Sequence, residues 1–117
     1  LLERVPSWVF VEWSRANDFV QDVNYPSNML YAAALEAAGE IYRRVSWRDA
    51  ASAVRAKVRE QSWDGEWFVD NARRLPDGRL ERTRNRTETC QYYAFFFGAA
   101  DRASHPDCEP LRGDPNV

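Results

Sequence analysis

The stretch PSNMLYAAALEAAGEIYRRV, residues 26–45, decides the fold expected for this chain of 117 residues. Pro26 is followed by Ser27 and Asn28, two residues that cap helices well, so we predict that the first helix begins here. From residue 29 to residue 45, apolar side chains cover nearly the whole helical circumference. A helix that is apolar on most sides is usually buried on most sides, and we expect this one to lie inside the protein.

Two further helices are predicted downstream. Ser46, with an aspartate three positions later, resembles a capping box, so the second helix is expected to start at Trp47. Its apolar residues fall on one stripe, which predicts one buried face and one exposed face. Thr87 and Glu88 provide a cap and a first-turn carboxylate for the third helix, whose residues 92–100 are again apolar all round.

The remaining segments are expected to be extended or to turn. The aromatic and β-branched residues of segment 6–13 favour extended backbone. Asp64-Gly65 and Asp77-Gly78 are turn signals. They predict short extended pieces around two turns, with a hairpin as one arrangement.

The order of the helices, buried then half-exposed then buried, is typical of two concentric layers of helices. In a barrel of helical hairpins the inner helices are covered on both sides, whereas the outer helices keep a solvent face. We therefore expect an all-α fold of three helices with short extended segments in the loops. No repeat of fixed period supports a solenoid.

Composition and charge exclude several classes of partner. The chain has 16 basic and 18 acidic residues, a net charge of −2 and no dense cluster of basic residues. We therefore expect no binding to nucleic acid or to an anionic membrane surface. No apolar run approaches the ~20 residues that span a bilayer. Cys90, His105 and Cys108 make neither a disulfide framework nor a metal-ligand pattern, so we predict two reduced thiols, no metal and no cofactor. Nothing in the sequence indicates where the protein is localised.

Acidic and aromatic residues gather in the two loops that lead into the apolar helices. Glu12-Trp13 stands in the first loop and Thr87-Glu88 in the second. If the inner helices run parallel, both loops reach the same rim, where rings can stack on sugars and carboxylates can bind hydroxyls or work as acid and base. Two structural interpretations stay open: Trp13 as a core aromatic residue, and Glu88 as an ordinary helix-start charge.

Three short motifs resemble a known family. FVEWS at residues 10–14, NMLYAAAL at residues 28–35 and TETCQYYA at residues 87–94 look like the middle of the six-hairpin (α/α)6 barrel of bacterial α-L-rhamnosidases and related glycoside hydrolases. The resemblance runs from about residue 8 to residue 100. It implies a partial (α/α)6 barrel, with residues 1–117 as a fragment of a single glycosidase catalytic domain.

The resemblance also implies a function. The family hydrolyses terminal sugars by inversion, using a general acid that would precede this region and a general base that would follow it, so both catalytic residues are expected outside this chain. Glu12 and Trp13 match positions where the family often has Asp-Trp, and Glu88 matches a position that is often Gln. We therefore expect Glu12, Trp13 and Glu88 to contact a carbohydrate substrate without transferring protons, and the remainder of the barrel to be the chain's structural partner.

Two alternatives remain open at this point. One is a non-catalytic helical interaction module whose aromatic residues only form a core. The other keeps the barrel but changes the sugar, as in a glucuronide or trehalose hydrolase or a phosphorylase. The loops carry too little sugar-specific information to separate these enzymes.

Overall fold

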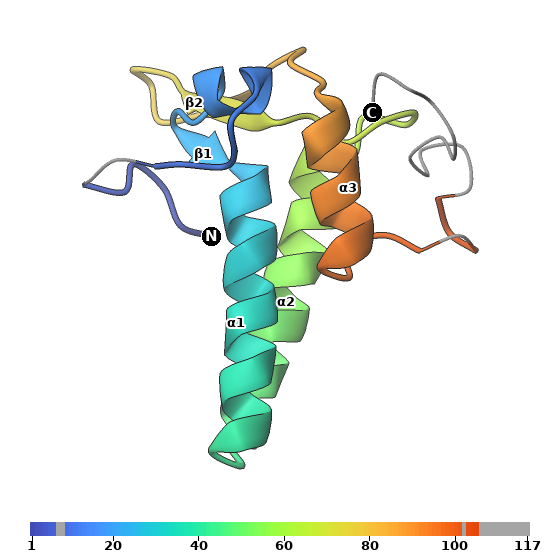
Figure 1. Ribbon diagram of the computed structural model, residues 1–117. Coiled ribbons are helices and arrows are strands. Elements are labelled where there is room, and N and C mark those ends of the chain that lie inside the picture. The colour runs from blue at the N-terminus through green and yellow to red at the C-terminus, as the bar shows by residue number, and fades with distance from the viewer. Residues whose placement is uncertain (7–8, 102, 106–117) are drawn as a thin grey trace.

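Three α-helices and a three-stranded antiparallel sheet make up the part of the chain that the structure describes, residues 1–6, 9–101 and 103–105 (Figure 1). The structure is a computed structural model. In chain order the elements are the 3-10 helix η1 (Arg15–Asp18), β1 (Val23–Asn24), α1 (Tyr25–Ile41), α2 (Val45–Ser62), β2 (Asn71–Arg74), β3 (Leu80–Arg82) and α3 (Glu88–Phe96).

The sheet shows that the predicted all-α fold, a partial (α/α)6 barrel, is wrong. Its strand order is β1-β2-β3, and both pairings are antiparallel. Val23 faces Ala72 across the first pair, and Arg74 faces Leu80 across the second. The sheet lies at the end of the α1–α2 hairpin where α1 begins (Figure 1). Strands of two to four residues are too short for an alternating pattern to reveal them in the sequence.

Both predicted turns are confirmed, and one of them closes a hairpin. Gly78, with a φ of +88°, lies in the turn between β2 and β3, where the Leu75 N–H donates to the Arg79 carbonyl at 2.8 Å. Gly65 has a φ of +104°, and the Asp64 carboxylate accepts hydrogen bonds from the backbone N–H groups of Glu66 and Trp67. Of the predicted extended segment, residue 6 and residues 9–13 are described, and they form no strand.

The three predicted helices are present, but two of them start elsewhere. Asn24 caps α1, since its Oδ1 atom accepts from the Ser27 N–H at 2.9 Å, so the helix begins before the predicted signal. The capping box at Ser46 is wrong: α2 begins at Val45 and has no side-chain cap. The Thr87 cap is confirmed by its bond from the Cys90 N–H at 3.2 Å.

The turn between α1 and α2 explains the early start of α2. Arg43 has a φ of +53°, the Arg44 N–H donates to the Gly39 carbonyl at 2.8 Å, and the Arg43 N–H donates to the Glu40 carbonyl at 3.4 Å. These two bonds form a Schellman motif, which normally places glycine at the position that Arg43 occupies. The chain therefore turns tightly and enters α2 without a capping side chain.

The expectation that α1 and α3 are buried on most sides is wrong for the described structure. Ile41 of α1 is 75% exposed and Phe96 of α3 is 83% exposed. The far end of the α1–α2 hairpin projects beyond the sheet and α3, which leaves its apolar residues in solvent (Figure 1). The prediction for α2 is confirmed, because Ala51 and Val58 are buried while its opposite face is exposed.

The core lies where the sheet, both long helices and α3 meet. It contains Val23, Tyr25, Met29, Val58, Phe68, Val69, Ala72, Cys90, Ala94, Ala99 and Ala100. The Cys90 thiol donates to the Val69 carbonyl at 3.6 Å, whereas Cys108 lies outside the described residues. In the part of the chain that the structure describes, no helix has the length and apolar character needed to cross a bilayer.

Candidate functional site

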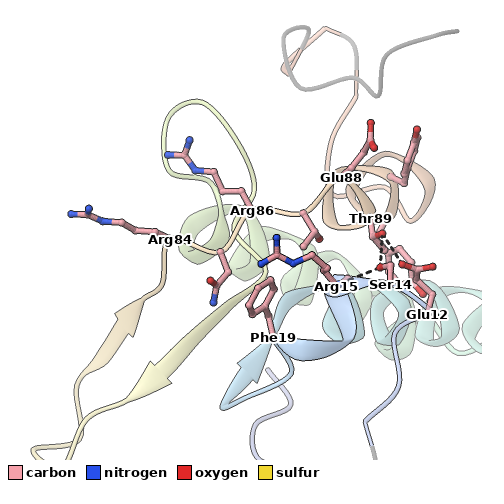
Figure 2. A pocket seen from close by; sticks show the side chains of 13 residues that line it. Glu12, Ser14, Arg15, Phe19, Arg84, Arg86, Glu88 and Thr89 are labelled. Atoms are coloured by element: carbon pink, nitrogen blue, oxygen red, sulfur yellow. Dashed lines mark hydrogen bonds between the residues drawn. The ribbon is translucent and has the colours of Figure 1, made fainter. Parts of the chain in front are cut away.

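A groove of about 840 Å³ separates the segment around η1 from the segment that leads into α3. The first wall comes from residues 12–19 and the second from residues 84–93 (Figure 2). The lining residues are Glu12, Ser14, Arg15, Ala16, Phe19, Arg84, Asn85, Arg86, Thr87, Glu88, Thr89, Tyr92 and Tyr93. The groove thus combines carboxylates, hydroxyls, guanidinium groups and aromatic rings.

A chain of hydroxyl groups joins the two walls. The Thr89 hydroxyl donates to Glu12 Oε1 at 2.9 Å, and its oxygen lies 3.4 Å from Ser14 Oγ (Figure 2). Because Thr89 has one hydroxyl proton and gives it to Glu12, Ser14 is the donor in the second bond. Ser14 Oγ in turn accepts from the Ala16 N–H at 3.1 Å. The donors therefore point in one direction and end on a carboxylate, an order in which each bond strengthens the next.

Two more bonds fix the first wall to α3 and to itself. The Tyr93 hydroxyl donates to the Val11 carbonyl at 2.7 Å, and the Val11 N–H donates to Asn17 Oδ1 at 2.9 Å. Burial raises the pKa of Tyr93, and the negative charge of Glu12 raises it further. Tyr93 is therefore a neutral donor at ordinary pH, and it holds the loop before Glu12 against the helix.

The arginine side chains of the groove differ in their surroundings. Arg86 lies 2.6 Å from Asp64 and 3.8 Å from Glu66, which ties the second wall to the 64–67 turn. Among the described residues no carboxylate pairs with Arg15 or Arg84. Arg15 extends along the groove, whereas Arg84 points away from it (Figure 2).

A fully buried acid, Asp70, lies beneath the second wall. Its Oδ1 atom accepts from the Thr87 N–H at 2.7 Å, and its Oδ2 atom accepts from the Thr87 hydroxyl at 2.6 Å. Burial raises the pKa of Asp70 to about 6, against the two Thr87 bonds, which lower it. The backbone N–H of Asp70 donates to the Asn85 carbonyl at 2.8 Å, and its carbonyl accepts from the Tyr25 N–H at 2.9 Å.

Asn71, the neighbour of Asp70, joins the segment that follows the first wall to the second wall. Its amide nitrogen donates to the Gln21 carbonyl, and its Oδ1 atom accepts from the Thr83 hydroxyl at 2.7 Å and from Asn85 at 3.0 Å. Another buried amide, Gln91, exchanges hydrogen bonds with the backbone of Phe68 at 3.0 Å and 2.8 Å. Buried amides that satisfy distant backbone groups fix loops that have no regular structure of their own.

Sequence reasoning missed Asp70 and Asn71. Asp and Asn are common in turns, so their residue types alone do not indicate burial. The signal that marks them is a polar pair between the apolar residues Phe68-Val69 and Ala72. Polar residues enclosed by core residues in this way indicate buried groups with specific partners.

Of the three residues expected to contact sugar, two line the groove and one does not. Glu12 and Glu88 line the same groove, as the two loops were expected to do, although Glu88 extends away from the Glu12–Thr89 bond (Figure 2). Trp13 does not line it. Its side chain is 87% exposed and makes an edge contact with Phe10, with ring centroids 4.9 Å apart. The structural interpretation of Trp13 as a core residue is therefore wrong.

Comparison with known proteins finds no relative of this chain. No protein-family model matches the chain, and no curated protein or solved structure matches it either. The resemblance to α-L-rhamnosidases therefore stays a prediction. No group of three His, Cys, Asp or Glu side chains within the described ranges is arranged to hold a metal ion.

Proposed function

We propose that the chain supplies a carbohydrate-binding groove to a glycoside hydrolase that cleaves terminal, α-L-rhamnoside-like sugars. The observation that carries the proposal is the meeting of Glu12 and Glu88 in one groove, together with hydroxyl groups and aromatic rings. These are the two loops in which the sequence motifs predicted sugar contacts. The sugar is named from the motif resemblance alone.

The groove has the donors, acceptors and rings that a sugar requires. Glu12 uses Oε1 for the Thr89 hydroxyl, and no other hydrogen bond to its carboxylate is found among the described residues, so Oε2 is available to a sugar hydroxyl. The rings of Tyr92, Tyr93 and Phe19 line the same space. Ring faces pack on the C–H faces of sugars, while a carboxylate orients their hydroxyl groups.

The proposed reaction is inverting hydrolysis by two carboxylates spaced ~6.5–9.5 Å apart, which leaves room for water. In this proposal Glu12 and Glu88 bind and orient the sugar, and the proton-transferring acid and base come from outside the chain. Glu12 is held by Thr89, an arrangement that suits an acceptor of fixed position. The proposal needs no metal and no cofactor.

An NMR titration of the 117-residue chain with L-rhamnose tests the binding step. We expect shifts at Glu12, Thr87 and Thr89, and weaker binding after Glu12→Ala. Asp49→Ala, at an exposed position on α2, is the matched control and should bind like the wild type. The chain alone should not hydrolyse an aryl α-L-rhamnoside. Absence of shifts with L-rhamnose and with a panel of other neutral and acidic sugars would exclude the groove as a sugar site.

A second candidate function, a helical interaction module, is favoured by a different observation. Large apolar side chains are exposed at the far end of the α1–α2 hairpin and on α3, namely Ile41, Tyr42, Val45, Trp47 and Phe96. At the hairpin end the Tyr42 and Trp47 rings pack edge to face, with centroids 5.8 Å apart, and exposed apolar groups of this kind indicate contact with other protein surfaces. This function predicts that Glu12→Ala leaves partner binding unchanged, whereas Ile41→Asp weakens it.

A further inference from the structure

Asp70 occupies a position from which one side chain controls the second wall of the groove. Asp70 is the residue before β2. It is fully buried, and both of its carboxylate oxygens accept hydrogen bonds from Thr87. Thr87 is the N-cap of α3 and lines the groove, and the next two residues of the groove, Glu88 and Thr89, follow it directly. Asp70 therefore contacts the residue that caps α3 and lines the groove.

We propose that Asp70 is the positioning residue of the groove: by holding the N–H and hydroxyl of Thr87 it fixes Thr89 at bonding distance from Glu12. The proposal rests on the proposed function only where it concerns sugar binding. In the described residues, the printed hydrogen bonds of the Asp70 carboxylate go to Thr87, so in this proposal Asp70 acts on a ligand through Thr87 and the first turn of α3.

Hydrogen-bond geometry explains why an acid is suited to this position. The Thr87 hydroxyl already accepts from the Cys90 N–H at 3.2 Å, so its proton is free to be donated, and the Thr87 N–H needs a second acceptor. A carboxylate offers two acceptor oxygens at once, whereas an uncharged Asp or Asn offers one acceptor and one donor. The charged form also lies at the positive end of α3, where negative charge is stabilised.

Titratable groups of α1, of α3 and of the segment before α3 make hydrogen bonds or ion pairs to groups other than Asp70. From α3, the Cys90 thiol bonds to the Val69 carbonyl, and from α1 the Tyr25 hydroxyl bonds to Gln61 at 3.2 Å. In the segment before α3, the Arg86 guanidinium pairs with Asp64. No hydrogen bond or ion pair to the Asp70 carboxylate comes from any other residue in the described ranges.

The Thr87 amide proton is a direct spectroscopic reporter of this contact. In the 117-residue chain labelled with ¹⁵N, its chemical shift should move with pH as Asp70 titrates, because an N–H bonded to a carboxylate is sensitive to that charge. The movement should be lost in Asp70→Asn and retained in the control Asp49→Asn. A Thr87 shift that does not move, or that moves equally in Asp70→Asn, would overturn the proposal.

Ligand binding separates positioning from a merely structural role. Asp70→Asn keeps an acceptor for the Thr87 N–H but loses the one for its hydroxyl, so it should weaken L-rhamnose binding by about threefold. Asp70→Ala leaves both Thr87 donors without an acceptor and should weaken binding on the order of tenfold. Equal losses in the two variants, with folding retained, would contradict positioning. If the Thr87 amide titrates but no sugar binds, the proposed function fails while the positioning of Thr87 by Asp70 stands.

Discussion

The buried Asp70 carboxyl makes the stability of the fold depend on pH in the direction opposite to that of a salt-bridged acid. Burial raises its pKa from 3.8 to about 6, and the Thr87 bonds offset only part of this effect. The folded state therefore binds a proton more tightly than the unfolded state between these two values. The free energy of unfolding contributed by this group should fall as pH rises from about 4 to about 6, and should be constant above that range.

The size of the effect follows from the size of the pKa shift. A shift of about two units corresponds to about 3 kcal/mol between the two protonation states. Asp70→Asn cannot ionise, so its own contribution does not change with pH. The difference in unfolding free energy, variant minus wild type, should therefore increase by about 3 kcal/mol between about pH 4 and about pH 7.

Urea denaturation followed by tryptophan fluorescence measures this difference across that range. Other acids act in the opposite direction: hydrogen bonds from Arg74 lower the pKa of Glu3 and of Asp22. Burial lowers the pKa of His105 and so favours folding as pH rises. These groups are shared by wild type and variant and cancel in the difference. A difference that is independent of pH, or that decreases as pH rises, would refute the argument.

Three further predictions concern particular contacts and are tested by the same denaturation assay, with an L-rhamnose titration added for the last. Arg43→Gly should raise the free energy of unfolding by about 1 kcal/mol, because Arg43 has a φ of +53° that glycine adopts without strain. An unchanged or lower stability would show that Arg43 is not strained at this turn. Gly98→Ala should lower the free energy of unfolding more than Gly78→Ala does. Both glycines have a positive φ, but only the Cβ added at residue 98 would lie 3.1 Å from Arg55 Nε. Equal losses of stability would show that the Arg55 side chain moves aside freely. Thr89→Val removes the hydrogen bond to Glu12, so it should lower the free energy of unfolding by about 1 kcal/mol and weaken L-rhamnose binding. Lower stability with unchanged L-rhamnose binding would show that this bond does not support the sugar site.

The helices could be predicted from the sequence because their signals are local. The apolar run after Pro26 and the Thr87-Glu88 start each lie within one or two turns of the helix that they specify. The start of α2 could not be predicted in this way. Its position follows from the left-handed residue Arg43 and the closure of the preceding turn onto Gly39, and no capping residue marks it.

The β2–β3 hairpin could be anticipated from the Asp77-Gly78 turn, but the pairing of β1 with β2 could not, since it joins residues about 50 positions apart. Asn24 and Asn71 face each other across β1 and β2, and both side chains are buried and polar. Propensity places asparagine in turns and disfavours it in strands. The side-chain bonds from Asn24 to Phe19 and from Asn71 to Gln21 make the buried asparagines favourable, and their partners are known only from the fold.

The groove, like the sheet, depends on contacts between segments that are distant in the sequence. Its two walls are loops, and loops are ordinarily the most mobile parts of a fold. Here they are tied to the rest of the fold: the buried residues Asp70 and Asn71 bond to Thr87 and Asn85, and the half-buried Tyr93 bonds to Val11, next to the first wall. The two buried anchors are polar groups that must be satisfied inside the core, at a cost that simple loop closure would not require. A fold that places several such groups beneath one groove keeps that groove's side chains in fixed positions, which is the property that recognition of a sugar by oriented hydrogen bonds requires.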